Sequence, residues 1–346
     1  MNPRPAPVAL LPWALSILDP AGGESPPSLS LVAGDASQRR YFRLEYAGHR
    51  YVLVEAPPAT EKNAEFLQVR ALLAQAGVRV PALLGADLSR GFLLLEDLGD
   101  RLLLAALDPV TVDGYYTSAF NVLAKMAALE GSDTGLGAYD QTLLTEELGR
   151  FQQWFVQGLL GYAPTTAEQT LLQDFFKVLV DSALEQPRVL VHRDFHSRNL
   201  MLLETDELAV IDFQDAVLGP VTYDLVSLLR DCYIQWPVAR VQQWALQYRD
   251  LLCSRGLLVE LDEAQFLRWF DWMGLQRHIK VLGTFARLYL RDGKPGYLTD
   301  LPLVLDYVVE ILDKYAAEVP AFANFRAWFS LRMAPLIAQQ DWSKKQ

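Results

Sequence analysis

The chain has 346 residues, which is enough to bury a large core and to form two domains or lobes. Acids outnumber bases by 42 to 31, and the net charge of −11 argues against nucleic acid or an anionic membrane as a partner. No apolar run approaches the ~18 residues that span a bilayer, the two cysteines imply no disulfide framework, and we recognise no signal peptide. We therefore expect a cytoplasmic globular protein.

The first hundred residues are predicted to form a small β-rich lobe with one main helix. Residues 28–56 contain three short apolar or alternating runs with a turn at Gly48, which is typical of an antiparallel meander. Residues 62–76 carry apolar side chains at helical spacing. A further strand is expected within 91–99, where an apolar run ends in acidic residues.

From about residue 101 the pattern is helical, apart from two apolar runs between residues 189 and 213. Aromatic residues recur at helical spacing over 226–346, and we expect most of them to be core residues. The order of elements predicts an α+β fold, with a small antiparallel β lobe over residues 1–98 and a large, mostly helical lobe over residues 99–346.

The most informative motif follows the first of those two apolar runs. Residues 192–199 read His-Arg-Asp-Phe-His-Ser-Arg-Asn, and the second run ends at Asp212. Asp194 can accept a proton from a hydroxyl group, while Asn199 and Asp212 offer an amide oxygen and a carboxylate to Mg²⁺. One base and two oxygen ligands are the minimum set for phosphoryl transfer from ATP, in which catalysis is mostly positioning and charge neutralisation.

This motif allows two other interpretations. An ordinary buried turn capped by an aspartate would require two motifs to coincide in order and spacing. A metal hydrolase would use His192, Asp194 and His196 as ligands, but such sites usually need further imidazoles, and the chain has four histidines in all. Phosphoryl transfer is the better explanation.

The order of His-Arg-Asp, asparagine, apolar strand and Asp-Phe resembles the catalytic signature of the protein-kinase-like fold. Residues 212–214 read Asp-Phe-Gln where protein kinases have Asp-Phe-Gly, and this resembles the aminoglycoside phosphotransferase branch, whose members phosphorylate small molecules. The resemblance implies a two-lobed protein-kinase-like fold in which the small lobe covers the nucleotide.

In such a fold the loop over the phosphates lies between the first two strands, which corresponds here to residues 34–40. This segment has one glycine, Gly34, so its donors would be main-chain N–H groups, the Ser37 hydroxyl and arginine side chains. A plain β-turn explains the segment equally well. Adenine would be bound at the hinge by main-chain groups of Glu96 and Leu98.

The third strand of this fold normally carries a lysine that contacts the phosphates, but residues 51–56 contain none. Another cation must then neutralise the phosphates. We expect Arg43, which lies on the neighbouring strand opposite the apolar face, with Arg40 and Lys62 as alternatives. A purely structural ion pair between Arg43 and Glu65 is an equal possibility.

Five segments carry a more specific resemblance, and they are residues 34–43, 55–58, 191–200, 212–225 and 276–288. On these segments the whole chain resembles one bacterial branch of this family, the anomeric amino-sugar kinases of peptidoglycan recycling, which act on N-acetylmuramate and N-acetylglucosamine. The resemblance implies ATP and Mg²⁺ as cofactors, a sugar 1-phosphate as product and a uridylyltransferase as the next enzyme.

By this resemblance Asp194 is the base that orients the sugar hydroxyl, and Asn199 and Asp212 are Mg²⁺ ligands. Asp224 would brace the catalytic loop by accepting hydrogen bonds from the backbone or an arginine. The pair His192-Arg193 is expected to be structural too, with direct substrate contact as the alternative.

The acceptor site should be built from helices of the large lobe. Arg277, His278 and Lys280 bring three polar groups together in an apolar helix, and both a buried ion-pair network and direct sugar contact explain them. An arginine would suit the lactyl carboxylate of N-acetylmuramate. Further candidates, including two aromatic residues that could stack on a sugar or simply pack, are Trp154, Phe155, Tyr223 and Asp231.

Two other functions stay open at this point. The missing strand lysine favours a pseudokinase that binds a nucleotide or a partner, although the intact set of Asp194, Asn199 and Asp212 argues against it. A kinase for another small alcohol, such as choline, homoserine or an aminoglycoside, would share the same motif.

Overall fold

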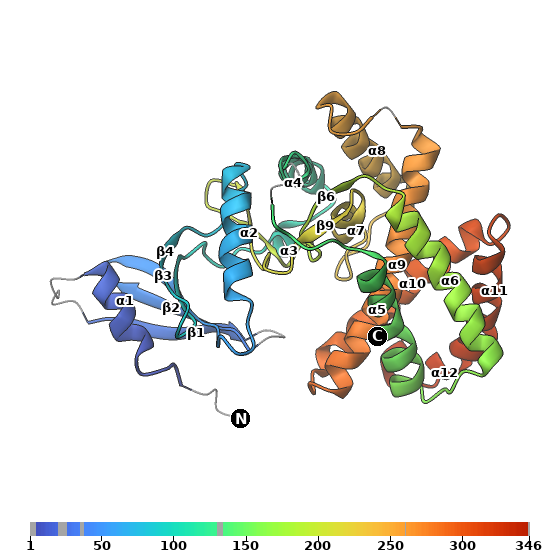
Figure 1. The fold of residues 1–346 in the computed structure, drawn as a ribbon, viewed down its shortest axis with the longest axis horizontal. Coiled ribbons are helices and arrows are strands. Elements are labelled where there is room, and N and C mark those ends of the chain that lie inside the picture. Colours follow the sequence, from blue (N-terminus) through green and yellow to red (C-terminus); the bar gives the residue numbers. More distant parts are fainter. Residues whose placement is uncertain (1–4, 20–25, 35–37, 130–133, 260, 345–346) are drawn as a thin grey trace. The chain divides into compact units, whose positions relative to one another are not determined.

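The computed structural model describes residues 5–19, 26–34, 38–129, 134–259 and 261–344. The chain packs into two compact units (Figure 1). Unit 1 comprises residues 1–106 and 198–215, and unit 2 comprises residues 107–197 and 216–346. Unit 1 thus extends beyond residue 98 and takes in a second segment that the sequence-based division assigned to the other lobe.

Unit 1 is built on a five-stranded antiparallel sheet in the order β1-β2-β3-β5-β4. Phe42, Leu44 and Tyr46 alternate onto the buried face of β2, and the turn at Ala47-Gly48 has positive φ at both residues, as a two-residue hairpin requires. The predicted meander is therefore confirmed. The strands are β1 (Ser28–Gly34), β2 (Arg40–Tyr46), β3 (His49–Glu55), β4 (Leu83–Asp87) and β5 (Phe92–Glu96).

Among the described residues, three helices belong to the first segment of unit 1. Helix α1 (Leu10–Leu18) lies against the sheet (Figure 1). It buries Leu10 and Ala14 in one apolar cluster with the sheet residues Leu44 and Leu53. Helix α2 (Asn63–Gln75) confirms the helix predicted over 62–76, and its face at Phe66, Val69 and Leu73 is buried. The short helix α3 (Leu103–Ala106) ends the first segment of the unit.

A short hairpin explains why residues 198–215 belong to unit 1. Strands β7 (Leu200–Leu202) and β8 (Leu208–Val210) pair with each other, and all six of their residues are buried. Met201 bridges to Leu102, and the N–H of Val210 donates to the carbonyl oxygen of Arg79 at 2.8 Å. These backbone bonds attach the hairpin to the first segment.

Unit 2 is organised around the long helix α9 (Glu263–Leu290), whose middle is buried on all sides. Gly283 permits a close approach there, because an added Cβ would lie 2.3 Å from the carbonyl carbon of Arg150. The other elements are α4 (Val112–Ala127), α5 (Gln141–Arg150), the π-helical segment η2 (Phe151–Leu159), α6 (Thr166–Leu184), α7 (Tyr223–Leu229), α8 (Val238–Ser254), η3 (Pro295–Asp300), α10 (Leu301–Tyr315), α11 (Pro320–Trp328), η4 (Phe329–Met333), α12 (Ala334–Ile337) and η5 (Asp341–Ser343).

A second two-stranded ladder lies in unit 2. Strand β6 (Arg188–Val191) pairs antiparallel with β9 (Val217–Pro220) and leads directly into the catalytic motif. The tryptophans of 226–328 are 2–8% exposed, which confirms that they are core residues. In the described part of the chain no helix is both long and apolar enough to cross a membrane.

Candidate active site

The catalytic loop begins where β6 ends, and Asp224 holds its first two residues. The N–H groups of His192 and Arg193 donate to the Asp224 carboxylate at 2.6 and 3.0 Å. The predicted brace is thus confirmed, and its donors are backbone amides. Arg193 has φ of 77°, a conformation that a non-glycine residue adopts only when its surroundings hold it.

Asp194 is half-buried, and its N–H donates to Nδ1 of His192 at 3.3 Å. Removal from water opposes ionisation of its carboxyl group, but positive charge nearby outweighs this effect and lowers the pKa to about 2. The groups responsible, in decreasing order, are Lys280, His196, Arg193 and Arg277. Asp194 is therefore an ionised acceptor at physiological pH.

The buried acid Glu147 connects two of these cations. Its side chain is fully buried, accepts hydrogen bonds from Arg193 and from the hydroxyl of Tyr139, and lies 3.1 Å from Nζ of Lys280. Burial opposes its ionisation, but Lys280 and Arg193 keep its pKa below the usual value. Sequence reasoning missed Glu147, because one of two adjacent acids in helix α5 gives no local signal of its contacts.

Lys280 also donates to the hydroxyl of Tyr223 at 2.9 Å. For Lys280 the structure shows the buried ion pair that sequence reasoning weighed against sugar contact. His278 is fully buried as well, with Nε2 lying 3.1 Å from the carbonyl oxygen of Arg230 and its ring stacked on Tyr307. Burial lowers the pKa of His278 well below its usual value, so the ring is neutral.

Asp231 is buried beside the end of the catalytic loop. Its carboxylate accepts from the N–H and the hydroxyl of Ser197 at 2.9 and 2.5 Å, and from the N–H of Tyr233 at 3.2 Å. These contacts anchor the loop. On η2, Phe155 is fully buried and stacked on Phe151, whereas Trp154 is half-buried.

The two expected metal ligands lie in unit 1, at the same end of the β7–β8 hairpin. Asn199 precedes Leu200, which pairs with Val210, and its carbonyl oxygen accepts from the N–H of Ile211 at 3.1 Å. Asp212 comes two residues after Val210 and has φ of 62°.

The Asp212 carboxylate is oriented by a neutral amide, since Nε2 of Gln214 donates to Oδ1 at 2.8 Å. An amide oxygen and a carboxylate at one hairpin end are the donor types that Mg²⁺ prefers, and a hydrogen-bonded neighbour that fixes a ligand is typical of metal sites. Asn199 and Asp212 therefore fit the role assigned to them.

Arg43 is held by the hinge segment of unit 1. Its guanidinium donates to both carboxylate oxygens of Asp97, at 2.5 and 3.0 Å, and to Asp100 at 2.9 and 3.0 Å. Hydrogen bonds to these two acids raise its pKa. The alternative pair with Glu65 named the wrong partner, since Glu65 is exposed on α2.

The two alternative cations also have acidic partners. Arg40 forms an ion pair with Glu55, and Nζ of Lys62 lies 2.6 Å from Asp215. The second of these pairs is largely exposed, so its contribution to stability is small.

Arg39, one of the two arginines in the segment expected to cover the phosphates, is 1% exposed in unit 1. Its guanidinium donates to Gln214 at 3.3 Å and to Asn63 at 3.4 Å, and it lies 5.0 Å from the centre of the Phe66 ring. Arg39 thus holds the amide that orients Asp212. The sequence placed Arg39 in this segment, but no local pattern indicated that its side chain would be buried.

Of the four residues expected to contact the nucleotide besides Arg43, the structure describes Gly34, Glu96 and Leu98. Gly34 ends β1 opposite Arg40, whereas Ser37 lies outside the described residues. The N–H of Glu96 donates to the carbonyl oxygen of Ala82 at 2.9 Å, and its carboxylate binds Arg79. Within the described ranges no hydrogen bond engages the main chain of Leu98.

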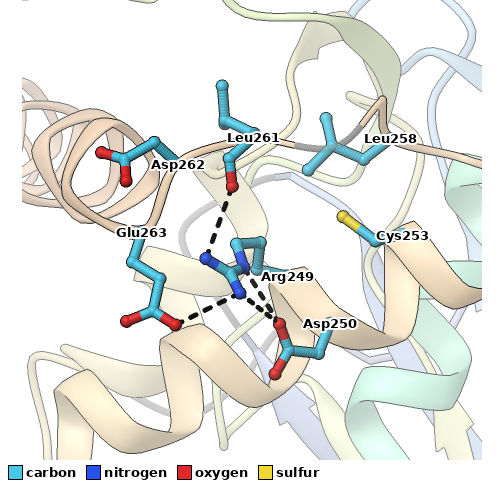
Figure 2. A pocket seen from close by; sticks show the side chains of 7 residues that line it. All are labelled: Arg249, Asp250, Cys253, Leu258, Leu261, Asp262 and Glu263. Atoms are coloured by element: carbon cyan, nitrogen blue, oxygen red, sulfur yellow. Dashed lines mark hydrogen bonds and ion pairs between the residues drawn. The ribbon is translucent and has the colours of Figure 1, made fainter.

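A hollow at the start of α9 involves none of the candidate site residues. Figure 2 shows its lining, in which Arg249 donates to Asp250, Glu263 and the carbonyl oxygen of Leu261. Its polar groups therefore satisfy one another, and the hollow adds nothing to the site.

Comparison with known proteins gives the family. The Phosphotransferase enzyme family matches residues 28–269. Three proteins named N-acetylmuramate/N-acetylglucosamine kinase are similar over most of their length. The one from Pseudomonas putida is 44% identical over 86% of this chain and 87% of its own, and the one from Pseudomonas aeruginosa is 42% identical over 83% and 84%. The one from Neisseria meningitidis is 40% identical over 85% and 89%.

Solved structures confirm the protein-kinase-like fold. An ADP-bound aminoglycoside phosphotransferase superposes with a TM-score of 0.60 at 13% identity, covering 88% of this chain and 99% of its own. A choline kinase from Streptococcus pneumoniae gives 0.60 at 14% identity, covering 87% and 98%. At these identities the likeness concerns the fold alone. The family match and the kinase-named relatives together show that this chain belongs to the phosphotransferase enzyme family and is a kinase.

Proposed function

We propose that this protein transfers the γ-phosphoryl group of ATP to the anomeric hydroxyl of N-acetylmuramate and N-acetylglucosamine, giving the sugar 1-phosphate. The observation that carries the proposal is the electrostatic state of Asp194, which the surrounding cations keep ionised beside the braced loop. The names of the relatives support the choice of sugar.

In this proposal Asp194 accepts a hydrogen bond from the anomeric hydroxyl and orients its oxygen for attack on phosphorus. A carboxylate with a pKa of about 2 is a weak base, so its contribution is positioning and late acceptance of the proton. Asp224 fixes the backbone that presents it, and Glu147 fixes Arg193 and Lys280 around it.

The donor side is assigned to unit 1. Asn199 and Asp212 would hold Mg²⁺, which when bound neutralises charge on the phosphates. The main chain of Leu98, with Glu96 beside it, would bind adenine. Gly34, Ser37 and the loop they belong to would cover the phosphates, and Arg43 would supply the positive charge that the absent strand lysine provides in other kinases.

The acceptor side would lie within the lobe over residues 99–346, and the donor side would be covered by the lobe over residues 1–98. Among the acceptor candidates, the half-buried Trp154 keeps an accessible surface for a sugar ring, whereas His278 and Asp231 are engaged in the protein interior. The ATP dependence suits the cytoplasm, and a uridylyltransferase acting in peptidoglycan recycling would consume a sugar 1-phosphate.

Product analysis tests this proposal. The protein is incubated with ATP, Mg²⁺ and either sugar, and NMR reads the coupling of phosphorus to the anomeric proton. A 1-phosphate is expected. Phosphorylation at O6 would keep the kinase and reject the anomeric position, and transfer only to choline, homoserine or an aminoglycoside would reject the amino sugar.

One observation favours a second candidate. Arg43, Arg40 and Lys62, the cations expected to replace the strand lysine, all pair with acids. A nucleotide-binding protein without transfer activity would fit that arrangement. Tight ATP binding with no phosphate transfer to any of these acceptors would establish it.

A further inference from the structure

The buried cations of unit 2 differ in how their charge is balanced. Arg230 donates to the fully buried Asp271 at 2.7 Å, and Lys280 and Arg193 both pair with the fully buried Glu147. Pairing is what elementary electrostatics demands, because an unpaired charge removed from water costs several kcal/mol.

Arg277 is the exception among these cations. Its residue is 3% exposed, and in the described parts of the chain its one hydrogen bond runs from Nη1 to the sulfur of Cys232 at 3.6 Å. No carboxylate of the described residues forms an ion pair with it. Burial raises the pKa of the Cys232 thiol to about 11, so the thiol is neutral and cannot balance the guanidinium.

The position of Arg277 connects it with the acceptor. Arg277 and Lys280 are three residues apart on α9 and therefore share a face of the helix. Both cations lower the pKa of Asp194, and the negative charge of Asp194 in turn raises the pKa of Arg277. The guanidinium of Arg277, which forms no ion pair with a described carboxylate, thus lies in the electrostatic neighbourhood of the residue proposed to receive the acceptor hydroxyl.

We propose that Arg277 binds a carboxylate of the acceptor, and that it is the residue by which this protein prefers N-acetylmuramate to N-acetylglucosamine. The inference rests on the proposed function. The two sugars differ by an ether-linked lactyl group that carries one carboxylate, and the planar fork of a guanidinium matches a carboxylate with two parallel hydrogen bonds. The substrate would supply the direct ion-pair partner that Arg277 lacks among the described residues.

The rival explanation is that Arg277 only holds Asp194 ionised, and kinetics with both sugars separate the two. Arg277→Met should lower kcat/KM for N-acetylmuramate by about 10- to 100-fold, the range for losing a charge-assisted hydrogen bond. The kcat/KM for N-acetylglucosamine should fall by less than about threefold, because Lys280 and Arg193 still keep Asp194 ionised. Equal losses for both sugars would overturn the proposal, as would a loss expressed in the KM for ATP.

Two further variants complete the test. Arg277→Lys keeps the charge but not the fork, and should restore part of the preference for N-acetylmuramate. Cys232→Ala removes the hydrogen-bond partner of Arg277 and leaves the charge of Arg277 in place. It should therefore change kcat/KM only slightly, and by the same factor for both sugars. If the preference for N-acetylmuramate is lost in Cys232→Ala but kept in Arg277→Met, the assignment is contradicted.

Thermal unfolding gives a readout independent of turnover. An unpaired buried cation is costly, so Arg277→Met should leave Tm unchanged or raise it, whereas a structural role would lower it. N-acetylmuramate should raise the Tm of the unchanged protein more than that of the variant. If the unchanged protein phosphorylates neither sugar, the proposed function and this inference both fall. If it phosphorylates both and the variant keeps its preference, this inference alone falls.

Discussion

The β7–β8 hairpin of unit 1 and the β6–β9 ladder of unit 2 are both short antiparallel pairs that present functional side chains at one end, yet their polar groups are held differently. At the first, Asp212 is oriented by the amide of Gln214, a neutral group. At the second, the positive charges of Lys280, Arg193 and Arg277 act on Asp194, and Glu147 pairs with the first two.

The difference follows from what each carboxylate is proposed to do. A metal ligand must keep its negative charge for the ion, and the amide of Gln214 helps to fix the orientation of Asp212 without adding a charge. A residue that receives a proton at a buried site must first be kept ionised there, and this requires positive charge. Asp194 belongs to unit 2, whereas Asn199, five residues later, and Asp212 belong to unit 1, so the proposed roles of the two groups can be tested separately.

The largest effect is expected from Asp212→Ala. Loss of the carboxylate should abolish turnover, because one of the two proposed oxygen ligands of Mg²⁺ is removed. Isothermal titration should show weaker Mg²⁺-dependent binding of an ATP analogue, while binding without Mg²⁺ changes little. Retained Mg²⁺ dependence would refute the assignment.

Asp194→Asn should lower kcat by about 10²-fold or more, the effect attributed to general-base positioning. Since Asp194 belongs to unit 2, nucleotide affinity should be unchanged, in contrast to Asp212→Ala. Single-turnover kinetics and nucleotide titration on both variants check this contrast. Near-normal turnover in Asp194→Asn would rule out the catalytic role.

A smaller effect is expected at Arg43. Arg43→Ala should raise the KM for ATP much more than the KM for sugar, and Arg43→Lys should restore it only in part, since a planar fork becomes a point charge. The structure sharpens this test, because Asp97 and Asp100 already bind Arg43. If both variants leave the KM for ATP unchanged, the role of Arg43 is structural and consists of its ion pairs with the hinge segment.

Arg39→Lys is the matched control for the Arg43 variants, since Arg39 is also an arginine of unit 1 but donates to Gln214, whereas Arg43 donates to the hinge segment. Arg39→Lys should weaken the Mg²⁺-dependent binding of ATP, because Arg39 holds Gln214, and Gln214 orients Asp212. The contacts of the hinge segment with Arg43 should stay intact. If Arg39→Lys alters the KM for ATP while Arg43→Ala does not, the positive charge for the phosphates is to be sought at Arg39.

Local patterns allowed much of this arrangement to be predicted. Alternation identified β2, helical spacing identified α2, and the spacing of Asp194, Asn199 and Asp212 identified the reaction class. The partners of the charged residues could not be predicted, because Glu147 and Arg193, or Arg39 and Gln214, are far apart in sequence and meet only through folding. For the same reason the assignment of residues 198–215 to unit 1 depends on backbone pairing with Arg101 and Leu102 that no local pattern encodes.

The smallest predicted effect concerns the pH dependence of stability at Asp224. Burial raises its pKa from 3.8 to about 6, although the N–H groups of His192 and Arg193 oppose the rise. A raised acid pKa means that the folded state binds the proton more tightly. The stabilisation is therefore fully present below pH ~4 and is lost as the pH rises through ~6. Two pKa units correspond to about 3 kcal/mol.

Asp224→Asn removes this titration while preserving the size of the side chain. The variant should be less stable than the unchanged protein at every pH, because its NH₂ group faces a backbone donor that the carboxylate accepted. The deficit in Tm should shrink by several degrees between pH 5 and pH 7.5, as the unchanged protein ionises a buried carboxyl group and the variant does not. Thermal scans of both proteins over this range measure the difference. A deficit that grows with pH would show that the ionised Asp224, rather than its protonated form, is the better brace for the catalytic loop.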